Sequence, residues 1–366
     1  MRVFNCDHCG HLVFFDSVQC LHCGSALAFL PDAITLAALE PAPQDGPDLW
    51  RRRAAGGLQD GAQGGGLYRL CRNHTEHQAC NFAIPAGNGS GLCASCQQTR
   101  ILPDLSAPAN LYRWKQIESA KRQLFYTLAR LGLEPAGGQA GPMFEFLADL
   151  PGAPPVVTGH VGGTITINIA EADDDERARR RIALGEPYRT LIGHLRHESG
   201  HFYWGLLVQG GGQLDAFRSL FGDERQDYAA ALAAHYVRQG AGDTEGWATH
   251  HVSAYAAAHP WEDWAETWAH YLHMIDLLET AACYQVGITV PDPAASVRQQ
   301  VADPFALPRP GFQEMVRQWV PLTLVLNSLN RSLGQHDAYP FALSAGALRK
   351  LHFVHDLVQA RRSIGL

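Results

Sequence analysis

The residues best suited to chemistry are two histidines and a glutamate, spaced as His197, Glu198 and His201. Residues four apart on an α-helix differ by about 40° around its axis, so both imidazoles would face one metal ion. Glu198, one position from His197, would reach a water molecule beside the metal and not the metal itself. Two neutral nitrogen ligands and a carboxylate that accepts a proton from water are the groups that metal-assisted hydrolysis needs. This HExxH pattern predicts a hydrolytic zinc site.

A helix over residues 187–208 would carry these three residues. Apolar side chains recur along it at spacings of three and four, which predicts a buried stripe with the histidines on the opposite side. The predicted stripe contains Tyr188, Leu191, Ile192, Leu195, Phe202 and Leu206, with Ser199 in its gap. Gly200 and Gly205 disfavour a helix, so we expect another element to approach the backbone closely there.

The third zinc ligand has to come from farther along the chain. A catalytic zinc ion binds three protein ligands and leaves its fourth position to water. The residues after His201 contain no histidine at the spacing of the metzincin motif, which excludes that class. Downstream candidates are Asp223, Glu224, Asp227, His250, His251, His259, Glu262, Asp263, Glu266, His270 and His273. An aspartate ligand from 223–227 is one alternative, although that stretch is equally typical of a solvated helix start.

A helix over 260–284 is the better source of that ligand. Pro260 suits a first helical position, and Glu262 and Glu266 lie four apart on one face. Either glutamate would serve as the ligand; the alternative interpretation is that acids in the first turn only complement the helix dipole and that Glu266 pairs with His270 at the surface. The apolar stripe of this helix comprises Trp264, Trp268, Tyr271, Leu272 and Ile275.

The run from Tyr255 to Glu266 is similar to the site of gluzincin peptidases related to the anthrax lethal factor catalytic domain. Those proteins have HExxH, then a tyrosine, then Glu-aromatic-aromatic-Ala-Glu. The resemblance implies His197, His201 and Glu262 as zinc ligands, Glu198 as general base and Tyr255 as hydrogen-bond donor to the oxyanion. It also implies that Glu266 hydrogen-bonds a ligand histidine. Asp263 stands where those proteins have an aromatic residue, so Glu266 as the third ligand stays open.

Two groups of four cysteines precede this region. The first consists of two CxxC knuckles, each followed by a glycine that relieves the tight turn, and predicts a zinc ribbon with a strand at 12–15. Its ligands would be Cys6, Cys9, Cys20 and Cys23.

The second group contains one knuckle and two single cysteines, with His74 and His77 as substitute ligands. Its predicted ligands are Cys71, Cys80, Cys93 and Cys96. Four protein ligands leave no open position, so both of these zinc sites would be structural and one further zinc catalytic. The ninth cysteine, Cys283, stands alone.

The whole layout resembles a bacterial family of predicted zinc-binding metallopeptidases with an N-terminal zinc ribbon. The residues that carry the resemblance are both cysteine groups, the sequence Ile101-Leu102-Pro103-Asp104-Leu105, the HExxH region and the tryptophan-rich run at 259–268. It covers nearly the full chain and implies a peptidase without indicating its substrate.

Composition narrows the class of partner. The 366 residues include 29 Lys+Arg against 36 Asp+Glu, a net charge of -7, which disfavours nucleic acid and anionic membranes as partners. Residues 1–30 show no signal peptide and no apolar stretch is long enough to span a bilayer, so the expected location is cytoplasmic. Paired cysteines in such a protein are more typical of metal sites than of disulfides.

The expected fold is α+β: a mostly helical zincin-like domain with a small sheet, preceded by zinc-ribbon modules. We predict a zinc ribbon at 1–30, a linker at 31–66, a second zinc module at 67–106 and a metallopeptidase domain at 107–366. Further helices are expected at 111–133, 225–238, 311–333 and 343–362, and a strand at 164–169 preceded by a turn at Gly162 and Gly163.

Two alternatives to an active peptidase remain at this point. The chain would be an adaptor that binds a protein through its zinc ribbon, with the HExxH fold as a scaffold. Otherwise it would be an autoinhibited peptidase whose cleft is occupied by one of the cysteine modules. The second alternative is weaker because all eight clustered cysteines are already assigned to structural zinc.

Overall fold

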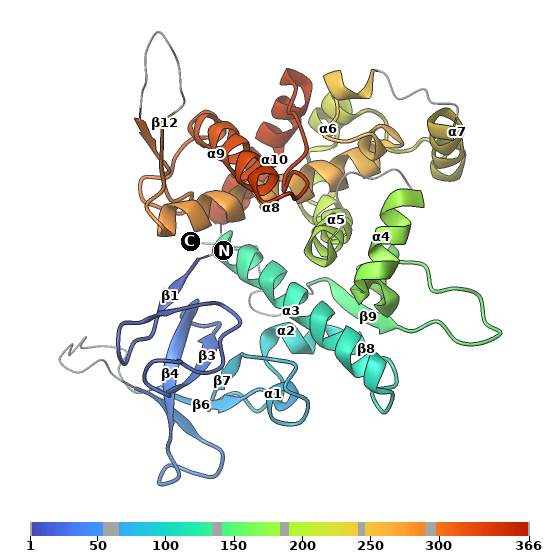
Figure 1. Cartoon of the computed structure of the whole chain (residues 1–366). Helices are drawn as coiled ribbons and strands as arrows, with labels where there is room; N and C mark the ends of the chain where they lie inside the picture. Colours follow the sequence, from blue (N-terminus) through green and yellow to red (C-terminus); the bar gives the residue numbers. More distant parts are fainter. Residues whose placement is uncertain are drawn as a thin grey trace. The chain divides into compact units, whose positions relative to one another are not determined.

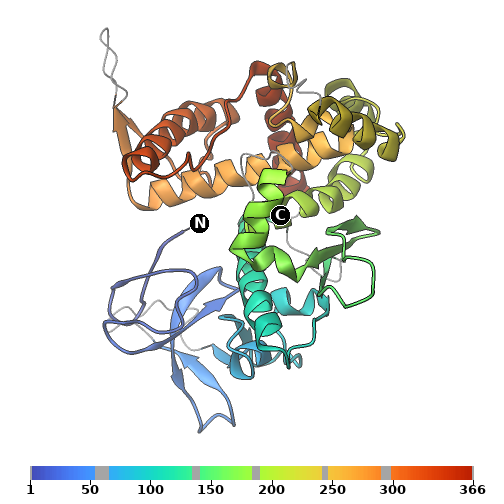
Figure 2. The same ribbon diagram turned by 45° about the vertical axis from the view of Figure 1, so that its right-hand side comes forward.

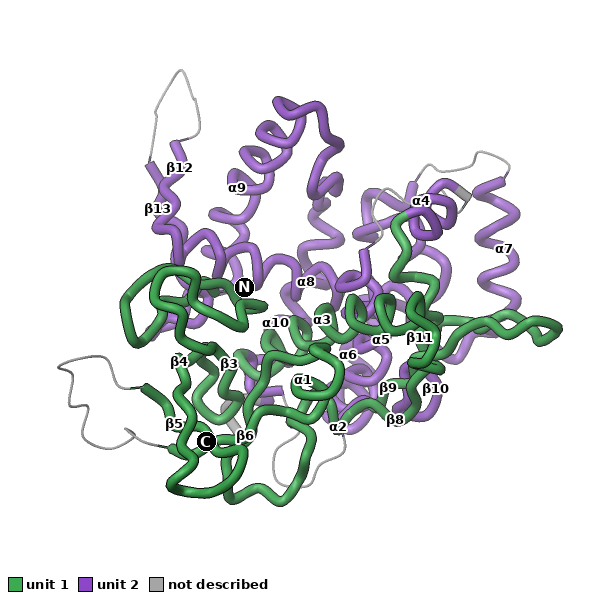
Figure 3. The backbone as a smooth tube through the Cα atoms, turned by 60° about the horizontal axis from the view of Figure 1, so that its bottom comes forward, with its two compact units in different colours: residues 1–130, 143–158, 166–174 green, residues 131–142, 159–165, 175–366 purple. Residues whose placement is uncertain are grey.

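The computed structural model describes residues 2–53, 66–133, 141–183, 190–240, 246–289 and 298–364 (Figure 1). The predicted α+β class is confirmed, because long helices dominate and the strands form several small sheets. The chain divides into two compact units (Figure 3). Unit 1 comprises residues 1–130, 143–158 and 166–174, and unit 2 comprises residues 131–142, 159–165 and 175–366. The predicted domain boundary at 106/107 does not coincide with this division.

Unit 1 is built around a five-stranded sheet with strand order β3-β4-β5-β6-β7. Its neighbouring strands pair antiparallel. The strands are β3 (Ala26–Leu30), β4 (Thr35–Pro41), β5 (Trp50–Arg52), β6 (Leu67–Leu70) and β7 (Ala83–Pro85). The linker predicted at 31–66 is therefore wrong for the residues of β4 and β5, while residues 54–65 lie outside the described part of the chain.

The first cysteine group sits on a separate two-stranded ribbon formed by β1 (Phe4–Asn5) and β2 (Leu12–Val13). The second group is carried by short helices, α1 (Arg72–Thr75) and α2 (Ala94–Gln97), near β7. Both groups share one hydrophobic core with aromatic side chains of the sheet and of α3 (Pro108–Arg130). Phe29 packs against Phe82, with ring centroids 4.7 Å apart, and against Tyr126 at 6.0 Å. The two cysteine groups thus share one hydrophobic core and do not form separate domains.

Two strands of unit 1 pair in parallel, β8 (Thr99–Ile101) with β9 (Met143–Leu147). A hairpin of β10 (Gly159–Val161) and β11 (Thr164–Asn168) follows, as predicted, with its turn at Gly162 and Gly163. Both turn glycines have positive φ, +56° and +84°, which other residues rarely adopt. After η1 (Ile169–Ala172), the chain enters α4 (Asp174–Ala183).

Unit 2 is helical, apart from the tip of that hairpin and the pair β12 (Gly287–Thr289) and β13 (Arg298–Gln300). Its helices are α4 from residue 175 on, α5 (Leu191–Tyr203), the π-helical η2 (Trp204–Gln209), α6 (Leu214–Phe221), α7 (Tyr228–Gly240), η3 (Trp247–Thr249), η4 (Tyr255–Ala257), α8 (Pro260–Cys283), α9 (Phe312–Ser332) and α10 (Ala345–Ile364). Helix α8 is central, because it contacts α5, α6, α9 and α10 (Figure 2). No helix in the described ranges is long and apolar enough to cross a membrane.

Sequence features explain the ends and the buried face of α8. Pro260 occupies the first turn, and His259 caps the helix by accepting a hydrogen bond from the backbone N–H of Trp261. The predicted apolar stripe is confirmed, since Trp264, Trp268, Tyr271, Leu272 and Ile275 are all buried.

The predicted stripe of α5 is only partly right. Leu195 and Ser199 are buried, but Leu191, Ile192, Phe202 and Leu206 are half-buried and Tyr188 lies outside the described residues. The buried face also includes Arg196, Gly200 and Tyr203. Arg196 can lie on the buried face because it pairs with the buried Asp276 of α8.

Gly200 lets α5 and α8 meet closely. A Cβ atom at this position would lie 3.0 Å from the Cα atom of Ala265 and 3.1 Å from the Trp268 ring. The indole N–H of Trp264 donates to the Gly200 carbonyl at 2.8 Å, and that of Trp268 donates to Ser199 Oγ at 3.1 Å. The expected close approach is confirmed here. It is wrong for Gly205, which lies in the π-helical turn and where an added Cβ atom would meet no described atom of another element within 4 Å.

Replacing Gly200 with alanine should therefore destabilise the protein, because the added methyl group meets backbone that cannot move alone. We expect a loss of about 1–3 kcal/mol in the free energy of unfolding, the usual cost of overpacking a core. Gly205→Ala is the matched control and should be neutral or slightly stabilising. Urea unfolding followed by circular dichroism compares the two; equal stability of both variants would contradict the packing argument.

Candidate metal centres

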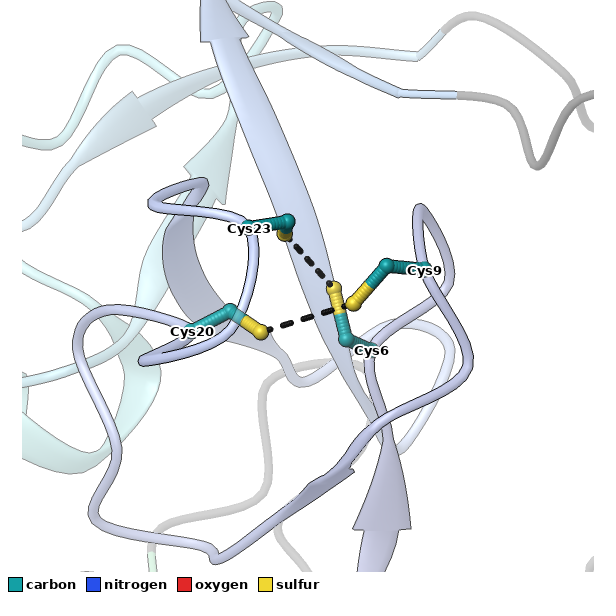
Figure 4. Close-up of side chains that lie close together, drawn as sticks. All are labelled: Cys6, Cys9, Cys20 and Cys23. Atoms are coloured by element: carbon teal, nitrogen blue, oxygen red, sulfur yellow. Dashed lines mark hydrogen bonds between the residues drawn. The ribbon is translucent and has the colours of Figure 1, made fainter.

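The four thiols of the first cysteine group converge on one point (Figure 4). The sulfur atoms of Cys6 and Cys23 are 3.8 Å apart, and those of Cys9 and Cys20 are 3.6 Å apart. A tetrahedral zinc ion with Zn–S bonds of about 2.3 Å would hold its sulfurs about 3.8 Å apart. A hydrogen bond with Ser25 lowers the pKa of Cys23 to about 6, which favours the thiolate that a metal needs. The geometry fits a closed four-thiolate site.

The second cysteine group has the same character and is more deeply buried. Its four sulfurs, from Cys71, Cys80, Cys93 and Cys96, lie within 4.8 Å of one another. The Cys80 and Cys93 sulfurs are 3.7 Å apart. His74 is not part of this group, which four thiols complete; its Nδ1 lies 2.7 Å from the backbone carbonyl of Cys80. All nine cysteines are free of disulfides.

A third cluster joins α5 and α8. His197, His201 and Glu262 each place one ligand atom within 4.8 Å of the others. Glu262 Oε2 lies 3.0 Å from His197 Nε2, and Glu262 Oε1 lies 3.9 Å from His201 Nε2. The i, i+4 spacing turns both imidazoles to the same side of α5, and the Gly200 contact brings the first turn of α8 opposite them.

The donor set of this cluster fits a zinc ion. Oε2 of Glu262 is buried and accepts no hydrogen bond from the described residues, which is costly for a carboxylate without a cation. Burial would raise the pKa of Glu262, but His197 and His201 lower it to about 2. Burial lowers the pKa of His201 to about 4, so this imidazole is neutral, as a ligand must be.

Glu266 lies behind His197, on the far side from Glu262. Its Oε1 is 2.7 Å from His197 Nδ1, and its Oε2 accepts a hydrogen bond from Ser253 Oγ at 2.6 Å. Although burial would lower the pKa of His197, the neighbouring carboxylates of Glu262 and Glu266 raise that pKa well above its usual value. A carboxylate on the second ring nitrogen fixes the tautomer and orientation of a metal-binding histidine.

Four further residues lie around this cluster. Glu198 is half-buried on α5. The ring of Tyr255 lies 5.9 Å from that of His197. Two others had no signal in the sequence: Tyr228 donates a hydrogen bond to Glu262 Oε1 at 2.7 Å, and the ring of His160 on β10 lies 6.0 Å from that of His201. Only the folded chain brings these distant segments together.

The other candidate ligands have partners elsewhere. Asp223 pairs with Arg225, Glu224 pairs with Arg218, and Asp227 accepts a hydrogen bond from the N–H of Ala230 at the start of α7. The interpretation of 223–227 as a solvated helix start therefore holds. Of the later histidines, His259 caps α8, and His273 contacts Arg196.

Asp263 stands where the gluzincin pattern has an aromatic residue, and its buried carboxylate has charged partners of its own. Burial raises the pKa of its carboxyl to about 7, while Lys350 of α10 lowers it. His251 Nε2 also lies 3.6 Å from its Oδ2. Asp263 thus joins α8 to α10 through a buried ion pair. Glu262, and not Asp263, faces His197 and His201.

Cys9, His11 and His22 make another group with ligand atoms within 4.8 Å. The two histidines are exposed and their rings stack in parallel at 3.7 Å. Ring nitrogens of parallel imidazoles do not converge on one ion, and Cys9 already belongs to the four-thiolate group.

Comparison with known proteins agrees with this picture. Residues 110–357 match a family described as "Putative zinc-binding metallo-peptidase", which covers more than half of the chain. The chain belongs to this family. Residues 3–107 match a zinc-ribbon domain, a range that contains both cysteine groups.

Proteins of Mycobacterium bovis and of two Mycobacterium tuberculosis strains, each described as uncharacterized, are 38% identical to the chain over 363 residues. The matched segment is 98% of this chain and 95% of each relative, so the similarity covers nearly the full length of both. No solved structure matches the chain.

The burial of His270 in α8 predicts how the stability of the protein depends on pH. This side chain hydrogen-bonds Tyr339 and is buried, and burial lowers its pKa to about 4. Because its pKa is lower in the folded than in the unfolded state, its contribution to stability is present above pH 6.5 and is lost as the pH falls toward 4.

We expect the free energy of unfolding to fall less steeply between pH 6.5 and 4 in His270→Gln than in the wild type, by on the order of 2 kcal/mol. His336→Gln, at an exposed position, is the control and should follow the wild type. Urea titrations at a series of pH values measure the difference; parallel curves for all three proteins would show that His270 is not kept neutral by burial.

Proposed function

We propose that this protein is a zinc-dependent metallopeptidase that hydrolyses peptide bonds. The observation that carries the proposal is the convergence of His197 Nε2, His201 Nε2 and the buried Glu262 carboxylate, with Glu266 on the far nitrogen of His197. Two imidazoles and one carboxylate are the ligand set of catalytic zinc in several peptidases. Membership of the zinc-binding metallopeptidase family supports the same activity.

In this proposal His197, His201 and Glu262 would hold a zinc ion, which when bound would polarise the scissile carbonyl and lower the pKa of water toward about 7. Glu266 is assigned to orienting His197, with Ser253 holding its other oxygen. The arrangement agrees with the resemblance to the lethal factor type of gluzincin, which assigns the same roles to these two glutamates. Glu266 as the metal ligand is disfavoured because it contacts the Nδ1 side of His197, away from His201.

Glu198 is proposed as the general base. It follows His197 on α5, so its carboxylate lies one step around the helix from the ligand face. It would take a proton from the attacking water and pass it to the leaving amine. Tyr255 would donate a hydrogen bond to the oxyanion as charge develops on it. Burial raises the pKa of Tyr255, so its hydroxyl stays protonated and able to donate.

The two cysteine groups are proposed as structural zinc sites, giving three zinc ions per chain. All eight cysteines of these groups have a place in a four-thiolate set, which argues against a thiolate that blocks the catalytic zinc. The predicted cytoplasmic location and the peptide or protein substrate remain predictions.

A second candidate function is a protein-binding adaptor with the metallopeptidase fold as scaffold. The zinc ribbon exposes apolar side chains, among them Phe14 with 57% and Leu21 with 98% of their surface accessible. Such residues suit a protein contact. The two functions differ in whether Glu198 matters.

Glu198→Gln should keep three zinc ions per chain and lose hydrolysis, because glutamine keeps the size of the side chain but accepts no proton. We expect a drop of at least about 10²–10⁴-fold in kcat/KM, the usual contribution of a general base. A peptide library incubated with wild type and variant and read by mass spectrometry gives both the cleavage sites and the loss. Cleavage that survives the substitution would refute this mechanism, and absence of cleavage by both proteins would favour the adaptor.

Glu262→Ala and Glu266→Ala separate the roles of the two glutamates. Glu262→Ala should retain about two zinc ions after dialysis, because only the four-thiolate sites remain complete. Glu266→Ala should retain the third ion with an affinity about 10–100-fold lower, as expected for loss of a residue that orients a ligand. Elemental analysis and chelator competition measure both. The reverse pattern would make Glu266 the ligand.

A further inference from the structure

Tyr228 is the first residue of α7, far in sequence from every ligand, yet its hydroxyl reaches the metal cluster. It donates to Glu262 Oε1 at 2.7 Å. The other described side chains that face the Glu262 carboxylate are those of His197 and His201, its ion-pair partners. This phenol therefore controls one of the two carboxylate oxygens.

The ring of Tyr228 is held by the start of α8. Its centroid lies 5.2 Å from the ring of His259 and 6.5 Å from that of Trp261. His259 is itself fixed, since Nδ1 accepts from the Trp261 N–H at 3.1 Å and Nε2 lies 3.3 Å from the Gln226 carbonyl. The capping residue of α8 and the residue before Glu262 thus position the phenol together.

The two oxygens of Glu262 are consequently not equivalent. Oε1 accepts the Tyr228 proton, while Oε2 is buried without a hydrogen bond and lies 3.0 Å from His197 Nε2. An oxygen that accepts a hydrogen bond has one fewer lone pair for a metal, and its partner oxygen remains available.

We propose that Tyr228 is a positioning residue that holds Glu262 by Oε1, presents Oε2 as the single coordinating atom and thereby sets the affinity of the third metal site. The inference rests on the proposed role of Glu262 as a ligand. It gives the two tyrosines of the site separate tasks: Tyr228 acts on metal binding, and Tyr255 acts on the reacting carbonyl.

The protonation state of Tyr228 is consistent with its role as a hydrogen-bond donor to Glu262. Burial and the charge of Glu262 raise the pKa of Tyr228, so it remains a neutral donor beside the carboxylate. The ring of Tyr255 instead contacts those of His197 and His235. A phenol that donates to a ligand carboxylate fixes its orientation as Glu266 fixes His197.

The test compares Tyr228→Phe with Tyr255→Phe and with Tyr112→Phe, an exposed tyrosine of α3. Zinc affinity of the third site is measured by chelator competition, with the two four-thiolate zincs left in place as a check on folding. We expect Tyr228→Phe to weaken the third site about 10–100-fold, and the other two variants to stay within about threefold of the wild type.

A second readout distinguishes positioning from a general loss of structure. With cobalt in the third site and zinc in the thiolate sites, loss of the Tyr228 hydrogen bond should let both oxygens of Glu262 coordinate. The higher coordination number would weaken the visible absorption of cobalt in Tyr228→Phe and leave the Tyr112→Phe spectrum unchanged.

The outcomes separate this inference from the peptidase proposal. Wild-type affinity and spectrum in Tyr228→Phe would overturn the inference, even if the wild type cleaves peptides. Weakened metal binding in this variant with no cleavage by the wild type would uphold the inference and reject the peptidase. A wild-type protein that binds only two zinc ions would overturn both.

Discussion

The close contact between α5 and α8 at Gly200 is the constraint on which the third metal cluster depends. Two histidines on one helix define a direction, but the carboxylate must come from a second helix at a fixed separation. Backbone-to-backbone approach at Gly200 and Ala265 sets that separation. The indole N–H groups of Trp264 and Trp268 bond to α5, so α8 is also fixed along its axis. A larger residue at the contact would move Glu262 away from His197 and His201 together.

The candidate metal sites of the two units differ in how they relate to the surrounding core. In unit 1 the cysteine groups lie inside a core of aromatic side chains, so thiolate sites and core form one body. Small β modules bury little surface, and metal–thiolate bonds supply part of their folding free energy. In unit 2 the packing of long helices buries three large aromatic residues of α8, Trp264, Trp268 and Tyr271. The two cysteine groups are thus part of the core of unit 1, whereas the cluster of His197, His201 and Glu262 is positioned by the packing of helices in unit 2.

Much of this could be predicted from the sequence, because the relevant spacings are local. The positions of His197 and His201, the start of α8 at Pro260 and its apolar stripe follow from helical periodicity. The cysteine knuckles follow from their spacing. The family resemblance correctly anticipated a zinc-binding metallopeptidase with a zinc ribbon, while the assignment of Tyr255 stays a prediction.

What failed depends on tertiary partners. Residues 35–41 contain alanines and a proline that suggested a linker, yet small side chains fit the buried side of a sheet. The face of α5 was misjudged because Arg196 is buried against Asp276, a pairing invisible to a count of apolar residues. Tyr228 and His160 lie far from the motif in sequence, so only the fold reveals them. Which glutamate faces both histidines also depends on how α8 is placed against α5.

Neighbouring carboxylates on the first turns of α8 face different helices. Glu262 and Glu266 face His197 of α5, whereas Asp263 pairs with Lys350 of α10. Consecutive positions on a helix point in different directions, so these contacts act at different angles around the axis of α8. A rotation of α8 about its own axis would therefore disturb the histidine cluster and the ion pair with α10 at the same time.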